Sequence, residues 1–159
     1  EGLTVLQEKI AELTLKIETI EQEKQRAISM AQQTRTGYVY VISNIGTMGE
    51  NIVKIGMTRR IDPMERVREL GDASVPFTFD VHAMIRTKDA PKLERELHER
   101  FKKHRVNLVN NRKEFFKLSL VDVRDAISEI YSEEFEFNFE VTAFDYNRSS
   151  EIREQFLIS

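Results

Sequence analysis

Residues 3–31 follow a heptad pattern, and this pattern constrains the fold more than any other feature of the sequence. In the first three heptads every core position is leucine or isoleucine, and the spacing alternates strictly between three and four residues. Such strict spacing favours a two-stranded parallel coiled coil over an amphipathic helix that packs only on its own domain. The core positions are Leu3, Leu6, Ile10, Leu13, Ile17 and Ile20, followed by the weaker Lys24, Ala27 and Ala31. The pattern therefore predicts a coiled-coil helix over residues 1–34 and a homodimer, with a single packed helix as the alternative.

Composition leaves room for one ordinary domain beside this helix. The chain has 159 residues, of which 40% are hydrophobic and 32% are charged, and it contains no cysteine. Disulfide scaffolds, cysteine-ligated zinc sites and thiol nucleophiles are therefore excluded. No apolar run approaches the roughly 20 residues that a membrane-spanning helix needs. Because the chain begins at Glu1 inside the expected helix, we expect it to be a piece of a longer protein.

Charge is distributed unevenly along the chain. Residues 35–130 carry 18 Lys and Arg against 14 Asp and Glu, a net charge of +4, whereas residues 1–34 and 131–159 carry −2 and −5. A basic middle segment between acidic flanks is compatible with an anionic partner, although this net charge is modest for a protein that binds nucleic acid.

After residue 36 the pattern changes from helical to strand-like. Residues 38–42 and 52–55 are rich in aromatic and β-branched side chains, and the loop between them, residues 44–51, contains two glycines. We therefore expect a β-hairpin. Residues 77–85 alternate apolar and polar side chains and predict a third strand, and residues 114–118 are a further short strand-like run.

Start signals and apolar stripes predict three helices in the same region. They begin at Asp62–Pro63 with an end at Gly71, at Asp89–Pro91, and at Ser119 with an end at Tyr131. These elements define an α/β domain over residues 36–131. Residues 132–159 form an extension in which Phe135, Phe137 and Phe139 alternate with polar residues, and this alternation predicts an edge strand or a docked arm.

The sequence lacks the motifs of several common enzyme classes. The histidines at positions 82, 98 and 104 include no pair with the i, i+4 spacing of zincins, and there is neither a glycine-rich phosphate loop nor a nucleophile elbow. Four other polar residues stand within well-patterned elements, namely Tyr40, Lys54, Arg66 and Glu94. Three kinds of group together can cut a phosphodiester: a carboxylate that holds a divalent cation, a guanidinium, and a phenol or amine that acts on water. We expect Tyr40 and Lys54 to project from the same face of the hairpin.

Two segments of the hairpin resemble the signatures of the GIY-YIG endonuclease superfamily. They are Tyr38–Asn44 and Val53–Gly56, in the order and at the separation of that family. The run Leu93–Phe101, followed by Arg105–Asn107 and Glu114–Phe116, is similar to the branch typified by a phage T5 open reading frame and the Mug113-type domains. The resemblance covers about residues 36–120 and implies an α+β fold with a small antiparallel three-stranded sheet flanked by helices.

The resemblance implies a role for each residue that matches the family pattern. Tyr40 is implied to position or activate the attacking water, Arg66 to stabilise the phosphate, and Glu94 to bind one Mg²⁺ or Mn²⁺ ion. Lys54 departs from most of the superfamily, which has a tyrosine there, although this branch and some restriction enzymes of the superfamily carry lysine. Its ammonium is implied to act on the scissile phosphate or as a base.

Two further residues are weaker matches. His98 lies one helical turn after Glu94, as a base or as a support for the metal site, and Asn107 matches a late active-site asparagine. Each candidate also has a structural alternative, such as a packing role for Tyr40 or an ion pair between Arg66 and Glu69.

These implications together predict a divalent-metal-dependent DNA endonuclease without a small-molecule cofactor, dimeric through the coiled coil. DNA contacts are expected from five basic residues: Arg59, Arg60, Lys102, Lys103 and Arg105. Similar proteins occur in bacteria and phages, where some resemble antiviral defence nucleases and some are membrane-associated through further segments; this piece itself is expected to be cytoplasmic. The alternatives are a nucleic-acid-binding module without catalysis, which Lys54 favours, and a unit that serves mainly for oligomerisation.

Overall fold

The computed structural model describes residues 2–159, except for the side chains of residues 31–33. The predicted coiled-coil position Ala31 therefore lies outside the described side chains. The chain divides into two compact units, with the boundary between Arg35 and Thr36. Residues 132–159 belong to the second unit.

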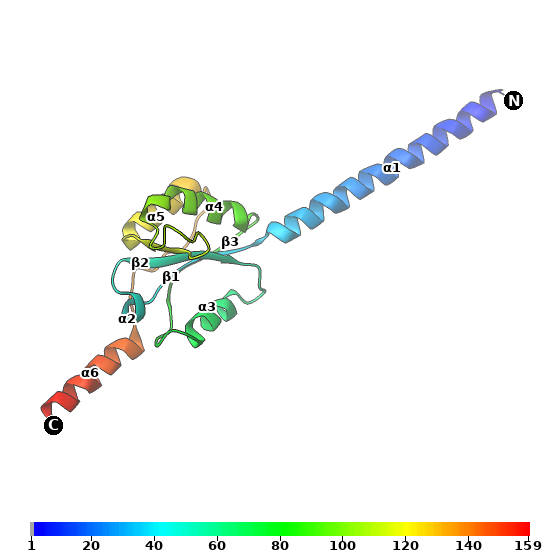
Figure 1. Cartoon of the computed structure of the whole chain (residues 1–159). Coiled ribbons are helices and arrows are strands. Elements are labelled where there is room, and N and C mark those ends of the chain that lie inside the picture. The colour runs from blue at the N-terminus through cyan, green and yellow to red at the C-terminus, as the bar shows by residue number, and fades with distance from the viewer. Residues whose placement is uncertain (1) are drawn as a thin grey trace. The chain divides into compact units, whose positions relative to one another are not determined.

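The first unit is a single helix, α1 (Gly2–Arg35) (Figure 1). Residues 3–35 contain neither glycine nor proline, so no residue interrupts the backbone hydrogen bonds. The first six heptad core side chains remain 57–76% exposed in this single chain. The helix was predicted correctly, and its apolar stripe is open to a partner; pairing into a coiled coil stays a prediction.

The second unit is built on a four-stranded antiparallel sheet with the order β3-β1-β2-β4 (Figure 1). The strands are β1 (Gly37–Ser43), β2 (Ile52–Thr58), β3 (Asp80–Thr87) and β4 (Phe115–Lys117). The α+β class is confirmed, but the prediction of three strands was wrong. The short run around Phe116 is a strand because it pairs with the outer edge of β2.

The third predicted strand begins three residues later than expected. The last partner of β3 in β1 is the pair Ser43–Asp80, so residues 77–79 have no strand beside them. The backbone carbonyl of Phe77 instead accepts a hydrogen bond of 2.7 Å from the Asn44 side-chain amide. The alternation of residues 80–85 is that of a paired strand, whereas Phe79 before it packs against the core without strand pairing.

Four helices surround the sheet, and the three longest follow the predicted caps. The three are α3 (Pro63–Asp72), α4 (Ala90–Arg100) and α5 (Leu120–Ile130), and the side chains of Asp62, Asp89 and Ser119 cap them. Helix α3 runs through Gly71, which was predicted to end it. A Cβ at Gly71 would lie 3.3 Å from the backbone of Thr78, so glycine lets the following chain pack closely here. The loop of the hairpin contains the fourth helix, a single turn, α2 (Ile45–Met48).

The sheet is buried on both faces, and this determines where side chains point. Alternate residues of β1 lie on opposite faces. Val39 and Val41 pack with α4 and α5 in the main core, whereas Tyr40 and Ile42 pack with Val67 of α3. Figure 1 shows α4 and α5 on one side of the sheet and α3 on the other.

Residues 132–143 form a docked arm, as one of the two predictions for this segment proposed. Phe135 and Phe137 pack against the main core. The buried side chain of His82 fixes the arm, since its Nδ1 lies 2.7 Å from the Asn138 carbonyl and its Nε2 lies 2.6 Å from the Ser43 hydroxyl. A carbonyl can only accept, so Nδ1 carries the proton and Nε2 of the neutral ring accepts from Ser43.

The chain ends in a helix that the sequence patterns did not predict, α6 (Phe144–Ile158). It has no buried residue, and its last apolar side chains are exposed. Among the described residues, no helix is both long and apolar enough to cross a membrane.

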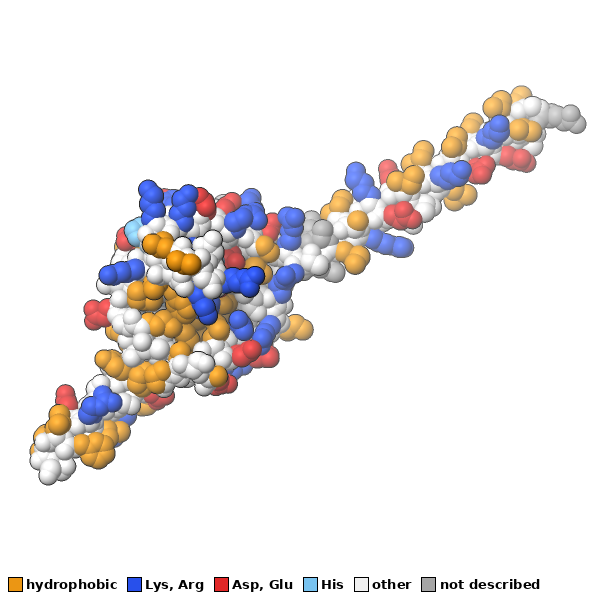
Figure 2. Space-filling model, viewed as in Figure 1, with side chains coloured by type: hydrophobic (Ala, Val, Ile, Leu, Met, Phe, Trp, Pro, Cys, Tyr) orange, Lys and Arg blue, Asp and Glu red, His pale blue; other side chains and the backbone are white. Residues whose placement is uncertain are grey.

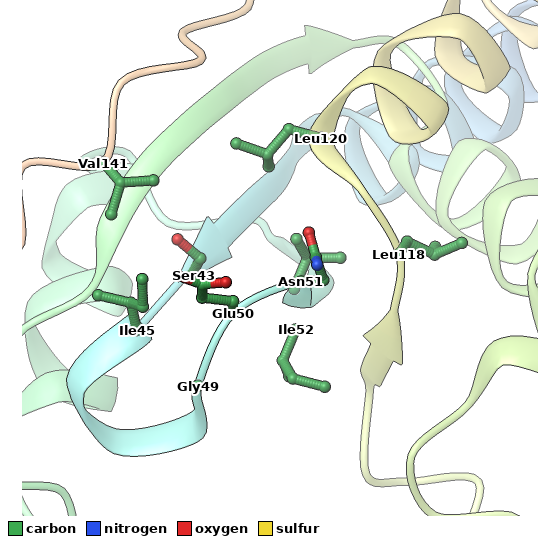
Figure 3. Close-up of a pocket in the computed structure, with 10 residues that line it drawn as sticks. Ser43, Ile45, Gly49, Glu50, Asn51, Ile52, Leu118, Leu120 and Val141 are labelled. Atoms are coloured by element: carbon green, nitrogen blue, oxygen red, sulfur yellow. The ribbon is translucent and has the colours of Figure 1, made fainter.

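A pocket of about 240 Å³ lies at the α2 end of the sheet (Figure 3). Its walls are mostly apolar and include Ile45, Leu118, Leu120 and Val141. None of the candidate catalytic residues lines it.

Acid should weaken the fold through His82. Burial lowers the pKa of His82 below its ordinary value of 6.5. Below pH 6.5 the unfolded chain binds a proton at this histidine more readily than the folded chain does. The free energy of unfolding therefore falls as the pH drops, by at most about 1.4 kcal/mol per pH unit. Urea unfolding at pH 7.5, 6.5 and 5.5 should show that His82→Gln, although less stable at pH 7.5, loses less stability on acidification than the unmodified chain. Equal losses in both proteins would contradict this account.

Candidate active site

The candidate site lies along the edge of β2, where β4 ends. β4 pairs only with Ile52–Lys54, and the Ile55 N–H then donates to the Glu114 carbonyl at 3.1 Å. Beyond this point side chains of α4 replace the missing strand. His98 Nε2 donates to the Ile55 carbonyl at 2.6 Å, and the Met57 N–H donates to the Glu94 carboxylate.

The spacing of α4 brings these two side chains to the same place. Glu94 and His98 are four residues apart and therefore lie on one face of the helix. Leu93 and Leu97, beside them in sequence, are buried in the core and fix the rotation of the helix. The apolar stripe thus aims the polar pair at the edge of β2.

Tyr40 and Arg66 approach from the other face of the sheet. Tyr40 lies directly across from Gly56 in β2, and a Cβ at Gly56 would stand 2.4 Å from the Tyr40 hydroxyl oxygen. Glycine at this position therefore lets the phenol lie flat over β2. Arg66, on α3, donates a side-chain hydrogen bond to the Tyr40 hydroxyl.

Lys54 shares the face of Tyr40, as the hairpin predicted. It pairs with Ile42, which lies two residues from Tyr40 in β1 and so points the same way. The side chain is only 8% exposed, and its Nζ forms an ion pair of 3.0 Å with Oε2 of Glu114. The ammonium also lies 5.2 Å from the centre of the Phe115 ring.

Glu114 is a site residue that no sequence argument identified. In the sequence it is only the first residue of a Glu-Phe-Phe run. The strand-like pattern of that run could have identified Glu114, because a strand paired to β2 places its first residues beside Lys54. That pairing partner becomes known only from the tertiary structure.

Burial dominates the electrostatics of this edge. Burial, reinforced by the nearby charge of Glu114, raises the pKa of Glu94 to about 7, against the opposing effects of Lys54 and Arg105. Burial also raises the pKa of Tyr40 to about 12, so its phenol is protonated at neutral pH. The pKa of His98 is lowered, chiefly by burial, which favours the neutral ring.

The site contains a set of groups suited to a hard divalent cation. Glu94, His98 and Glu114 each offer one ligand atom, and these atoms all lie within 4.8 Å of one another. Because Nε2 of His98 carries the proton that it gives to Ile55, its Nδ1 carries the lone pair, which here accepts from Arg105. Carboxylate oxygens suit Mg²⁺ and Mn²⁺, and an added imidazole nitrogen is better suited to Mn²⁺.

Asn107 lies in the loop that precedes β4 and shapes that loop. Its Oδ1 accepts hydrogen bonds from the N–H groups of Val109 and Asn110, at 3.0 and 2.8 Å. These bonds form a local turn of the kind that asparagine side chains commonly stabilise. The described contacts of its side chain therefore lie within its own loop rather than with Glu94.

The five basic residues predicted to contact DNA have different surroundings. Arg105 is half-buried, lies over the Phe116 ring, and places Nη2 3.3 Å from Nδ1 of His98. Arg60 forms ion pairs with Glu65 and Glu69 of α3. Lys102 pairs with Glu99 at 2.7 Å, and the side chains of Arg59, Lys102 and Lys103 are all exposed.

A groove of about 530 Å³ opens beside the metal-ligand set. It is lined by Glu94, Arg95, His98, Glu99, Lys102, Arg105, Leu108 and Asn111. Figure 2 shows lysine and arginine side chains gathered over the upper part of the globular unit, with exposed hydrophobic side chains among them. A groove lined by both carboxylates and cations suits a phosphate backbone that approaches a metal.

Comparison with known proteins bears on the same segment. The T5orf172 domain model matches residues 37–131, which covers the whole sheet and helices α2 to α5. The chain belongs to the T5orf172 domain family. This domain is GIY-YIG-like and is associated with endonuclease-like proteins. Searches of curated proteins and of solved structures gave no match.

The close approach of Tyr40 to Gly56 generates a test of this geometry. We expect Gly56→Ala to push the buried phenol out of place and to destabilise the domain by about 1–3 kcal/mol, as overpacking does. Urea unfolding measures the loss.

Gly49→Ala is the matched control. Gly49 has φ of +86°, but no atom lies within 4 Å of the position that a Cβ would take, so the added methyl group meets only backbone strain. We expect a cost of about 1 kcal/mol without any effect on the Tyr40 site. Unchanged stability of Gly56→Ala would contradict the close packing of Tyr40 over β2.

Proposed function

We propose that this T5orf172 domain is a divalent-metal-dependent endonuclease that hydrolyses phosphodiester bonds of DNA. One observation carries the proposal. Tyr40, Lys54 and Arg66 on one face of the sheet, and Glu94 around the edge of β2, lie close enough to influence one another electrostatically. These are the residue types that the resemblance to GIY-YIG nucleases implies, brought together from four different elements.

Each side chain has a role that its environment supports. Glu94 would hold Mg²⁺ or Mn²⁺, and the bound cation would supply positive charge against the negative charge that develops on the phosphate. Arg66 contacts Tyr40 and also pairs with Glu69 at 3.5 Å, and its remaining guanidinium N–H groups are donors for the phosphate. The protonated phenol of Tyr40 orients the attacking water by hydrogen bonding, since a pKa of about 12 makes it a poor base at neutral pH.

DNA is the proposed substrate because the groove beside Glu94 is lined by cations. Lys102 and Arg105 line it directly, and Lys103 lies next to them. Arg60 contributes less, because two carboxylates of α3 already balance its charge. The resemblance places such nucleases in bacterial defence against phages or in phages themselves, and we propose this biological setting for the chain.

A second copy of the chain is the proposed partner of α1. A pair of domains suits a duplex cutter, because each site cuts one strand. The exposed Leu and Ile stripe supplies the contact, since the heptad spacing matches a two-stranded coil.

A nucleic-acid-binding module without catalysis is the second candidate. The Lys54–Glu114 ion pair favours it, because a cation already engaged with a carboxylate is less available to a phosphate. Glu94→Gln distinguishes the two candidates, because a binder keeps its DNA affinity and its salt dependence without this carboxylate.

Plasmid cleavage tests the nuclease directly. With Mg²⁺ or Mn²⁺ the full chain should nick or linearise supercoiled DNA, and chelation should stop the reaction. Glu94→Gln should lower the cleavage rate by about 100-fold or more, since it removes a charged group that acts in the transition state. Gel analysis of supercoiled, nicked and linear forms over time gives the rates.

Glu96→Gln is the matched control for this experiment. Glu96 lies two residues away on the same helix and therefore points elsewhere, so its loss should leave the rate within about twofold. If neither the unmodified chain nor the control cuts DNA while all variants shift it in a gel, the binding module replaces the nuclease.

The dimer is tested by polar substitution in the heptads. Ile10→Asn together with Ile17→Asn should convert a dimer to a monomer, because it puts amides at two coiled-coil core positions. Sedimentation equilibrium measures the mass. Ser29→Asn, outside the core positions, should leave the dimer intact, and a monomeric unmodified chain would contradict the proposal.

A further inference from the structure

Glu114 lies between the ammonium of Lys54 and two other groups that can ligate a metal, Glu94 and His98. Its Oε2 lies 3.0 Å from Nζ of Lys54, while one of its oxygens is also within 4.8 Å of ligand atoms of Glu94 and His98. Lys54 and this ligand set lie at the same half-buried edge of β2, so a dication bound there would compete with Lys54 for Glu114.

The local charge balance makes this competition strong. Lys54 is 8% exposed, so little water screens its ion pair with Glu114. Glu94 faces the charge of Glu114 across the same space. A dication between the two carboxylates would contact both of them, whereas Lys54 forms an ion pair with Glu114 and acts on Glu94 through its charge.

The orientation of His98 fits a metal ligand. Ligating histidines usually donate their other ring N–H to a carbonyl or carboxylate, which fixes the tautomer and the ring plane. His98 does this through Nε2 and the Ile55 carbonyl at 2.6 Å, and the Phe116 ring packs against it with centroids 5.1 Å apart. One ring nitrogen of His98 lies within 4.8 Å of ligand atoms of Glu94 and Glu114, and Nδ1, which carries the lone pair, now accepts from Arg105 at 3.3 Å.

We propose that Glu114 is a second carboxylate ligand of the divalent cation, and that Lys54 and the cation compete for it. When the cation binds, Glu114 leaves Lys54, and the freed ammonium is available to the substrate phosphate. The use of that ammonium rests on the proposed nuclease function. The competition itself does not, because it concerns metal binding in the absence of DNA.

Competition has a distinctive signature in metal affinity. Glu94→Gln and Glu114→Gln should each weaken Mn²⁺ binding by about tenfold or more. Lys54→Met should instead tighten it by about threefold or more, because it removes the rival cation without adding a polar group. In a Glu114→Gln background, Lys54→Met should have a smaller effect, since the carboxylate for which the two compete is gone.

Calorimetric titration of the full chain with MnCl₂ at pH 7.5 measures these affinities. Glu99→Gln is the control, because Glu99 lines the same groove but is paired with Lys102 outside the ligand set. Thermal unfolding of every variant without metal checks that the domain is folded, and the rise in melting temperature with Mn²⁺ gives a second measure of binding.

The expected result is tightening in Lys54→Met, weakening in Glu94→Gln and Glu114→Gln, and no change in Glu99→Gln. Normal affinity in Glu114→Gln beside a loss in Glu94→Gln would leave a one-carboxylate site and overturn the inference. Weaker binding in folded Lys54→Met would also overturn it. If the Mn²⁺ affinities change as expected but the chain does not cut DNA, the metal site is supported and the nuclease is rejected. The two proposals can therefore be distinguished.

Discussion

The candidate site depends on the early end of one edge strand. β4 pairs with three residues of β2, and beyond Lys54 the outward backbone groups of β2 have no strand to bond with. A buried backbone group without a partner costs about 1–3 kcal/mol. His98 and Glu94 provide these partners from α4, and the same bonds hold the imidazole and the carboxylate at the edge. The same two hydrogen bonds therefore satisfy the backbone of β2 and position the side chains of the candidate site.

The burial of β1 between two layers supplies the other half of the site. Because alternate residues of β1 face opposite layers, Tyr40 lies under α3 while its neighbours Val39 and Val41 lie under α4 and α5. The site can gather side chains from both layers only at the edge of the sheet, where α4 reaches around β2. A fully paired β2 would separate Glu94 from Tyr40 by a strand.

Poor solvation makes the charges at this edge interdependent. Glu94, Glu114, Lys54 and Arg105 influence one another, and burial raises the pKa of Glu94 more than its cationic neighbours lower it. An added dication would affect every member of this set of carboxylates, neutral imidazole and buried ammonium, because a change in one charge interaction changes the others. Lysine at position 54 is thus part of the charge balance of the site, and the Glu114 carboxylate contacts it.

Local chemistry in the sequence was sufficient to predict α1, the hairpin and the three capped helices. Asp62, Asp89 and Ser119 act on N–H groups two or three residues away, so their effect does not depend on the rest of the fold. The shared face of Tyr40 and Lys54 followed from strand alternation and the order of the two hairpin strands. The membership in a nuclease-associated domain family was also readable from the motifs.

Long-range pairing could be decided only by the tertiary structure. The fourth strand, the late start of β3 and the contact of His82 with the arm at Asn138 each join residues far apart in sequence. Glu114 belongs with these features, because 60 residues separate it from Lys54. The sequence by itself determined which groups the site contains from α4 and the hairpin. The pairing of β4 with β2 decided which carboxylate stands beside the lysine, because strand register is a property of the assembled sheet.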